Sequence, residues 1–362
     1  MEIKKKARVI AFYLPQFHPT PNNDIWWGKG FTEWTNVCKA RPLFRGHYQP
    51  HVPADLGFYD LRLKETRIAQ AEMAKEYGVE GFCYYHYWFG NGRQELERPF
   101  QEVLESGEPD FPFMLCWANE SWHSKFWNKD GVVSEKKLLV EQRYEGFEDY
   151  TKHFYSLLPA FKDSRYLRME NKPMFMIYKP LNFTDVASFI DLWQRLAKEN
   201  GLDGLYFIGQ TEIESYIDTI LNQGFDGINI VRINYSKRKN VITKVFQKLH
   251  RIIFPKPYRY KYMKAKEHFL TKFAKQENIM PSILPNWDHT PRSGKNGFVL
   301  IDSTPYLFGQ VVRDAVEIVK GKHQDKRIVF IKSWNEWGEG NHMEPDLKFG
   351  KGYLEELKKN LY

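Results

Sequence analysis

Two glutamates stand in an aromatic setting near the C-terminal end of the chain, in the stretch SWNEWGEGNHMEPD. Glu336 and Glu339 are three residues apart, with Trp334 and Trp337 beside them. In a helical turn, residues three apart bring their Cβ atoms to about 5–6 Å, so both carboxyl groups can flank one bond. Apolar neighbours and mutual repulsion push two such pKa values apart, which suits acid–base cleavage of a glycosidic bond. The alternative is a turn whose acids favour the dipole of a helix N-terminus.

Further polar and aromatic residues stand near the ends of short apolar runs, where they could meet at one rim. We expect the substrate-binding residues to be Trp26, Trp27, Tyr84, His86, Trp117, Asn119, Glu120, Tyr178, Asp288, Arg292, Trp334 and Asn335. Three indoles share a glycine-containing loop, and we expect at least one of Trp26, Trp27 and Trp34 to line a cleft, because indole faces stack on sugar rings.

Structural alternatives remain open for four of these residues. His86 can be a satisfied core histidine. Glu120 can cap the next helix, and Asp288 and Arg292 can pair with each other.

Eight apolar runs alternate with amphipathic helical stretches, and they are the elements that must position these side chains. The candidate strands lie within residues 7–17, 79–89, 111–120, 173–180, 204–210, 224–231, 280–288 and 327–337. Helical patterns over 59–78, 183–201 and 305–321 separate some of them. This alternation predicts a single-domain (β/α)8 barrel of the TIM type over residues 1–362, with the site at the carboxyl ends of the strands. A doubly wound sheet fits less well because no glycine-rich phosphate loop follows the first strand.

The basic character of the chain comes from one segment. The net charge is +8, yet residues 236–276 hold 13 of the 53 Lys and Arg and one acid, Glu267, so 40 basic and 44 acidic residues remain elsewhere. Without a nucleic-acid motif or a wider basic face, we expect no nucleic-acid partner. Residues 236–280 form a basic insertion in which the apolar residues of 241–253 follow helical spacing. Such a helix either lies on an anionic membrane surface or covers the barrel mouth with its lysines solvated.

Cysteine and histidine usage indicates neither disulfides nor metal. Only three cysteines occur, and Cys83 and Cys116 lie inside apolar runs. The apolar run after the N-terminal lysines is too short for a signal peptide, and no stretch is long enough to span a membrane. We therefore expect a cytoplasmic protein, at the inner membrane face if the basic insertion binds lipid. His18, Asp24 and Glu33 share one loop without a recognised ligand spacing, so we expect no metal and no cofactor.

Six segments carry a family resemblance. WWGKGFTEWTNV, QPHVPADLGFYDLR, GFCYYHYWF, CWANESW, NWDHTPR and SWNEWGEGNHMEPD resemble, in the same order, the WbsX-like proteins of bacterial polysaccharide gene clusters. Those proteins are commonly labelled glycosyltransferases, and their sequences are similar to glycoside hydrolase family 99, the endo-acting α-mannosidases and mannanases. The resemblance covers nearly the whole chain.

The resemblance implies roles for particular residues. In family 99 barrels an E-W-x-E motif after the last strand carries both catalytic glutamates, and it matches residues 336–339 here. By this resemblance Glu336 acts as base on the substrate 2-hydroxyl, and Glu339 acts as general acid and then base. Gly338 stands where those hydrolases often have a histidine, which puts one substrate contact in doubt.

The resemblance leads us to expect a retaining endo-glycosidase that acts on a bacterial surface polysaccharide or its precursor. The first alternative is a glycosyltransferase of O-antigen, capsule or lipopolysaccharide biosynthesis, although we find no metal-binding acidic pair and no nucleotide-binding fold. The second is a non-catalytic glycan-binding protein, which would gain little from a buried pair of like charges.

Overall fold

Eight parallel strands form a closed barrel in the computed structural model, which describes residues 5–123, 137–233 and 256–362. The strands are β1 (Arg8–Tyr13), β2 (Gly81–His86), β3 (Phe113–Trp117), β7 (Lys172–Ile177), β8 (Tyr206–Thr211), β9 (Gly227–Ile230), β11 (Ile279–Ile283) and β13 (Ile328–Ile331). Each strand pairs with its neighbours in this order, and β13 returns to β1. The predicted (β/α)8 barrel is confirmed, and every strand lies in or overlaps one of the eight predicted apolar runs.

The strands are apolar because both of their faces are covered. Every residue of β2, β3, β8, β9, β11 and β13 is buried. Inside the barrel, Phe12 packs against Tyr85 and Phe330. Outside it, Trp193 of α6 (Val186–Glu199) packs against Phe175 at 4.9 Å between ring centroids. Continuous burial of this kind is what parallel strands beneath helices require.

Helices cover the outside of the barrel. Besides α6 they are α3 (Lys64–Glu76), α4 (Arg98–Ser106), α5 (Phe147–Lys162), α7 (Ile217–Leu221), α11 (Pro305–Val319) and α12 (Gly352–Leu361). The three predicted helical patterns correspond to α3, α6 and α11. The chain leaves α3 through Gly78, whose φ of +93° suits glycine, as the sequence predicts.

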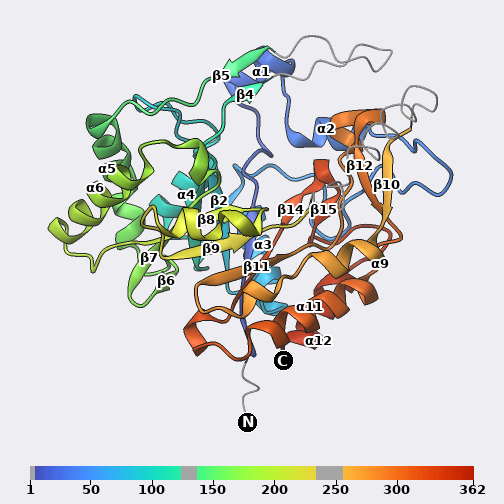
Figure 1. The fold of residues 1–362 in the computed structure, drawn as a ribbon. Helices are drawn as coiled ribbons and strands as arrows, with labels where there is room; N and C mark the ends of the chain where they lie inside the picture. The colour runs from blue at the N-terminus through green and yellow to red at the C-terminus, as the bar shows by residue number, and fades with distance from the viewer. Residues whose placement is uncertain (1–4, 124–136, 234–255) are drawn as a thin grey trace.

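Short elements gather beyond the carboxyl ends of the strands. They include α1 (Pro21–Trp27), α2 (Glu33–Lys39), the pair β4 (Trp122–His123) and β5 (Leu138–Val140), α10 (Thr290–Ser293), and the pair β14 (Asn335–Glu336) and β15 (Asn341–His342). Figure 1 shows α1, α2, β4 and β5 at the top and the N-terminus at the bottom. The remaining elements are β6 (Arg168–Met169), β10 (Tyr258–Lys261), β12 (Phe298–Ile301), α9 (Tyr262–Ala265) and the 3-10 turns 180–182, 214–216, 266–268, 272–275, 294–296, 324–326 and 337–339.

The basic insertion is only partly described. Its predicted helix, within residues 236–254, lies outside the described residues, whereas residues 256–278 contain β10, α9 and two 3-10 turns before β11 begins at Ile279. Tyr262, Ala265, Phe269 and Ala274 are buried, so this part packs onto the barrel.

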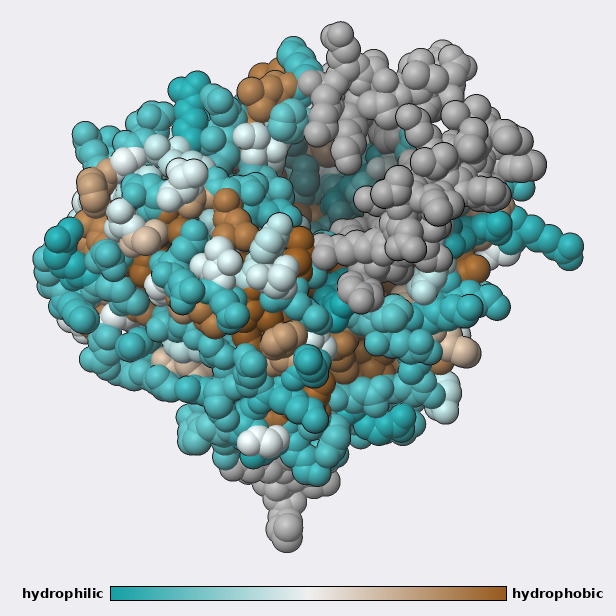
Figure 2. Space-filling model, in the orientation of Figure 1, coloured by the Kyte–Doolittle hydropathy of each residue, from teal (hydrophilic) through white to brown (hydrophobic). Residues whose placement is uncertain are grey.

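Among the helices that the structure describes, none has the length and apolarity needed to cross a bilayer. The face in Figure 2 is mostly hydrophilic, with apolar residues in scattered patches.

Candidate active site

A cavity of about 1240 Å³ opens at the carboxyl ends of the barrel strands. Every barrel strand, at its end or in the segment that follows it, contributes lining residues: Leu14 after β1, Tyr87 after β2, Ala118 after β3, Tyr178 after β7, Glu212 after β8, Ile233 after β9, Trp287 after β11 and Lys332 after β13. This is the end of the barrel at which TIM-type enzymes place their active sites.

The cavity wall is aromatic and acidic. Among the residues that the structure describes, the aromatic lining residues are Trp26, Trp27, Phe31, Tyr85, Tyr87, Trp122, Tyr144, Tyr178 and Trp287. In the same part of the chain, five carboxylates outnumber three basic groups: Glu33, Glu120, Glu212, Glu336 and Glu339 against Lys39, Arg292 and Lys332. Small-molecule pockets commonly measure about 300–1,000 Å³. A larger cavity with aromatic faces suits several sugar units in a row.

Arg292 joins three of these carboxylates at the cavity wall. Its Nε donates to Oε1 of Glu33 at 2.8 Å, Nη1 donates to Oε1 of Glu339 at 2.6 Å, and Nη2 donates to Oε2 of Glu336 at 3.1 Å. Since Nη1 and Nη2 belong to one planar guanidinium, it fixes Glu336 and Glu339 relative to each other. The structural alternative in which Arg292 pairs with Asp288 is wrong, because the guanidinium is bound by the three glutamates.

A short hairpin after β13 presents the two glutamates. Glu336 ends β14, Glu339 ends the 3-10 turn that follows, and β15 pairs back with β14. The backbone N–H of Glu336 donates to Oγ of Ser333 at 3.0 Å. Asn335 uses both ends of its amide on the backbone of Leu14, at 2.7 and 3.0 Å, which ties the hairpin to the end of β1. Glu336 itself lies in a strand and only residues 337–339 form a 3-10 turn, so the hairpin, and not a single helical turn, sets the spacing of the pair.

Burial and charge act together on Glu336. Its side chain is 6% exposed. Desolvation raises the pKa of the Glu336 carboxyl group and the negative charge of Glu339 raises it further, while Arg292 and Lys332 counteract this in part. A carboxyl group whose pKa lies above the ordinary value is suited to taking up and releasing a proton near neutral pH.

Trp334 and Trp337 lie behind the hairpin and leave the cavity wall to other residues. Nε1 of Trp337 donates to the buried carboxylate of Glu344 at 2.5 Å. The indole ring of Trp337 stacks on the ring of His342, with 3.7 Å between the ring centroids. Trp334 is fully buried and packs against Phe82. The expectation that these two indoles form an apolar wall around the carboxylates is therefore wrong, and they support the hairpin from its far side.

Gly338 leaves room for the third carboxylate. A Cβ atom at this position would overlap Oε1 of Glu33 and would lie 3.1 Å from Nε of Arg292. Glu33 occupies the space that a side chain at position 338 would need. The glycine is thus a steric condition for the contact between Glu33 and Arg292.

Eight of the predicted site residues line the cavity. They are Trp26, Trp27, Asn119, Glu120, Tyr178, Arg292, Glu336 and Glu339. Trp26 and Trp27 are partly exposed, whereas Trp34 is buried and donates through Nε1 to the carbonyl of Tyr59. Asn119 bonds the backbone of Lys179 through both amide ends, so it also joins the loops after β3 and β7.

Tyr84, His86 and Trp117 lie on the outer side of the barrel and not in the cavity. Tyr84 packs against Phe100 of α4, and Trp117 packs against Phe189 of α6. His86 contacts His153 of α5, with 2.7 Å between their Nε2 atoms. Burial lowers the pKa of His86 to about 3, so it is a neutral core histidine. Side chains alternate along a strand, and the cavity is lined by the other set, Tyr85 of β2 and Tyr87 just after it.

Asp288, Trp334 and Asn335 are also absent from the cavity wall. Oδ2 of Asp288 accepts from Nε2 of Gln49 and contacts Nε2 of His47, each at 2.7 Å, and its Oδ1 accepts from the hydroxyl of Thr290. Asn335 is occupied by the backbone of Leu14, as described above. These side chains hold loops in place.

Sequence reasoning passed over several residues of the cavity wall. Lys332 follows β13, is buried, and lies over the rings of Phe12 and Tyr85. Glu212 and His289 also line the cavity. Glu212 and His289 stand just after predicted strands, and this position was available as a signal. The ion pair between Glu33 and Arg292, by contrast, joins segments about 260 residues apart.

A closed barrel with paired carboxylates in an aromatic cavity at the carboxyl ends of its strands is the arrangement of a carbohydrate-active enzyme. The chain belongs to the WbsX glycosyltransferase family, because the family model described as Glycosyltransferase WbsX matches residues 9–357.

Two relatives from strains of Xanthomonas campestris pv. campestris, both called protein WxcX, are 32% identical over 98% of this chain. The chain spans about 50% of the length of each of these relatives.

Solved structures share the fold at low identity. A family 99 endo-α-mannosidase from Bacteroides thetaiotaomicron, in complex with bis-tris propane, gives a TM-score of 0.59 at 16% identity over 99% of this chain and 96% of that one. A glycoside hydrolase-like protein gives a TM-score of 0.61 at 14% identity over 100% of this chain and 95% of the other.

Proposed function

We propose that the chain is a retaining endo-glycosidase that acts on a bacterial surface polysaccharide or its precursor. The observation that carries the proposal is the pair Glu336 and Glu339, fixed by one guanidinium in a cavity at the carboxyl ends of the strands. The family 99 endo-α-mannosidase with the same fold adds a substrate class for the site.

The proposed reaction uses the substrate's own 2-hydroxyl as nucleophile. The reaction starts with Glu336 ionised and Glu339 protonated. Glu336 takes the 2-hydroxyl proton, O2 attacks C1, and the bond from C1 to the leaving oxygen breaks as Glu339 protonates that oxygen. The product is a 1,2-anhydro sugar with inversion at C1. Water then gives its proton to Glu339 and attacks C1, and O2 recovers its proton from Glu336. Two inversions give net retention, and both glutamates return to their starting state.

Arg292 has a defined part in this proposal. In the unliganded site it holds both carboxylates, and Glu339 has to leave Nη1 and take up a proton from solvent before it can protonate a leaving oxygen. Substrate entering the cavity would break this contact, so that the acid is set free only when a glycan is bound. Arg292 retains Glu33 as a partner throughout.

The second candidate is a glycosyltransferase, as the family description says. A nucleotide-sugar donor has a phosphate leaving group that needs no protonation, which fits a Glu339 held by Arg292. Against this, five carboxylates and three basic groups line the described part of the cavity, and such a wall repels a diphosphate.

A single experiment separates the two. The purified chain is incubated with a panel of bacterial surface oligosaccharides, with and without nucleotide sugars, and the products are read by mass spectrometry. We expect shorter oligosaccharides without any donor. Products that gain a sugar only when a nucleotide sugar is present would establish the transferase instead.

A further inference from the structure

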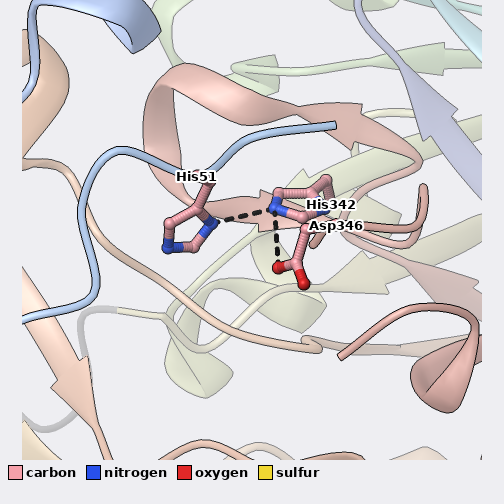
Figure 3. Close-up of side chains that lie close together, drawn as sticks. All are labelled: His51, His342 and Asp346. Carbon is pink, nitrogen blue, oxygen red and sulfur yellow. Dashed lines mark hydrogen bonds and ion pairs between the residues drawn. The ribbon is translucent and has the colours of Figure 1, made fainter. Parts of the chain in front are cut away.

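Three ligand-type side chains meet behind the β14–β15 hairpin, outside the cavity. His51 comes from the segment between α2 and α3, His342 from β15, and Asp346 from the loop that follows (Figure 3). Nδ1 of His51 lies 2.9 Å from Nε2 of His342, and that atom lies 4.0 Å from Oδ2 of Asp346. All three side chains are buried, and their ligand atoms lie within 4.8 Å of one another.

The surrounding backbone fixes how these groups point. Nδ1 of His342 donates to the carbonyl of Glu344 at 2.8 Å, which leaves its Nε2 with a lone pair toward the cluster. Oδ1 of Asp346 accepts the backbone N–H groups of Lys348 and Phe349 at 2.9 and 2.7 Å, which leaves Oδ2 toward His342. Histidines that ligate metals are oriented in this way by a carbonyl on the second ring nitrogen.

Two of the ligand atoms are hydrogen-bond acceptors that lie close together. Because Nδ1 of His342 donates to the carbonyl of Glu344, Nε2 of the neutral ring is an acceptor, and Oδ2 of Asp346, 4.0 Å away, is an acceptor as well. The Tyr48 hydroxyl lies beside the Asp346 carboxylate. One cation would satisfy all these lone pairs.

We propose that His51, His342 and Asp346 bind a divalent transition-metal ion of the Zn²⁺ type, with the Tyr48 hydroxyl or water beside them. A site with two imidazoles and one carboxylate favours ions of this type, whereas Mg²⁺ and Ca²⁺ favour sites made of oxygen ligands alone. Two nitrogens at about 2.0–2.1 Å from one ion lie roughly 3.0–3.4 Å apart, so the histidines need to separate by only a few tenths of an ångström.

The metal would act as a structural clamp. It would join the segment that carries His51 to the hairpin that carries Glu336 and Glu339. Because Trp337 stacks on His342, an ion at this position would also brace the 3-10 turn between the two glutamates. The inference does not depend on which reaction the cavity performs.

The chain offers a matched control. His86 and His153 form another buried imidazole pair, with 2.7 Å between Nε2 atoms and stacked rings, and neither is part of a metal-type cluster among the residues described. If two close histidines alone bound metal, this pair would do so as well.

The test uses the full chain after EDTA treatment and dialysis. Zn²⁺ is titrated in competition with a chromophoric chelator, and bound metal is counted by mass spectrometry after gel filtration. We expect one high-affinity ion per chain in the wild type and in His86→Gln. His51→Gln and Asp346→Asn should each bind at least about tenfold more weakly, because even loss of a group that only orients a ligand costs about 10–100-fold.

Thermal unfolding gives the second readout. Zn²⁺ should raise the melting temperature of the wild type and of His86→Gln and leave both ligand variants unchanged, with circular dichroism confirming that they fold. A wild type that binds no Zn²⁺ at equimolar concentration overturns the proposal. Ligand variants that bind as tightly as the wild type overturn it equally.

Discussion

Replacing Arg292 by Met removes the one guanidinium that three cavity carboxylates share. The side chains of Glu33 and Glu336 are 2% and 6% exposed, so their charges would lose their cation without gaining water. Breaking a buried ion pair by removing one partner costs about 3–5 kcal/mol. Because the Arg292 side chain is 24% exposed, we take the lower end and expect unfolding free energy to fall by about 3 kcal/mol at pH 7.5.

The loss should depend on pH in a defined direction. Arg292 lowers the pKa of Glu336 against the opposing effect of burial, so the pKa of Glu336 is higher in the variant than in the wild type. The stabilisation of ionised Glu336 by Arg292 is complete above the pKa that Glu336 has in the variant. It is lost as the pH falls from that pKa to the pKa that Glu336 has in the wild type. The difference between the two proteins should therefore shrink between pH 7.5 and pH 5.

Urea unfolding at both pH values, followed by tryptophan fluorescence, measures this difference. The control is Arg62→Met, which removes a guanidinium paired with Asp60 at the surface, where side chains are 41% and 29% exposed. That change should cost about 0–1 kcal/mol. If Arg292→Met lowers the free energy of unfolding by less than about 1 kcal/mol, or by the same amount at pH 7.5 and pH 5, Arg292 and its glutamates do not act as a buried ion-pair network.

Three other changes test separate parts of the structure. Gly338→Ala should push Glu33 off Arg292 and cost about 1–3 kcal/mol in urea unfolding, whereas Gly321→Ala, which has open space around it, should cost far less; equal losses would contradict the steric role. Trp26→Ala and Trp27→Ala should raise KM for an oligosaccharide about three- to tenfold, the equivalent of losing about 0.5–1.5 kcal/mol of stacking, and an unchanged KM in both would remove the stacking role. If the basic segment 236–276 lies on a membrane surface, which is one of its two interpretations, the chain should co-sediment with anionic vesicles and dissociate as salt rises; equal binding to neutral vesicles would contradict that interpretation.

The barrel itself was predictable from the sequence. Parallel strands buried on both faces read as continuous apolar runs, and β2 and β3 show this plainly. Their carboxyl ends meet at one rim, so Asn119 and Tyr178 could be placed at the cavity from position alone.

Which side of a strand faces the cavity was harder to predict. In YYHYWF both alternating sets are aromatic, so hydrophobicity does not distinguish Tyr85 from Tyr84. The helices outside the barrel determine which side faces the cavity. Phe100 of α4 packs against Tyr84, and His153 of α5 contacts His86, so both of these strand residues face outward.

Contacts between distant segments could not be predicted at all. Arg292 and Asp288 stand four residues apart, which suggests a local pair. Instead Arg292 pairs with glutamates at positions 33, 336 and 339, and the Asp288 side chain bonds residues 47 and 49 as well as its neighbour Thr290. The cluster of His51 and His342 likewise joins positions 291 residues apart, with no local ligand spacing to indicate it.

Glutamine substitution at each of Glu336 and Glu339 tests the proposed chemistry most directly, with turnover measured on a natural oligosaccharide and on an activated aryl glycoside. We predict that both variants fold and lose activity on the natural glycan. Glu339→Gln should keep part of its activity on the aryl glycoside, whose leaving group needs no proton, whereas Glu336→Gln should stay inactive on both. Near-normal activity of both variants on the natural glycan would show that the pair is structural, and would contradict the proposed active site.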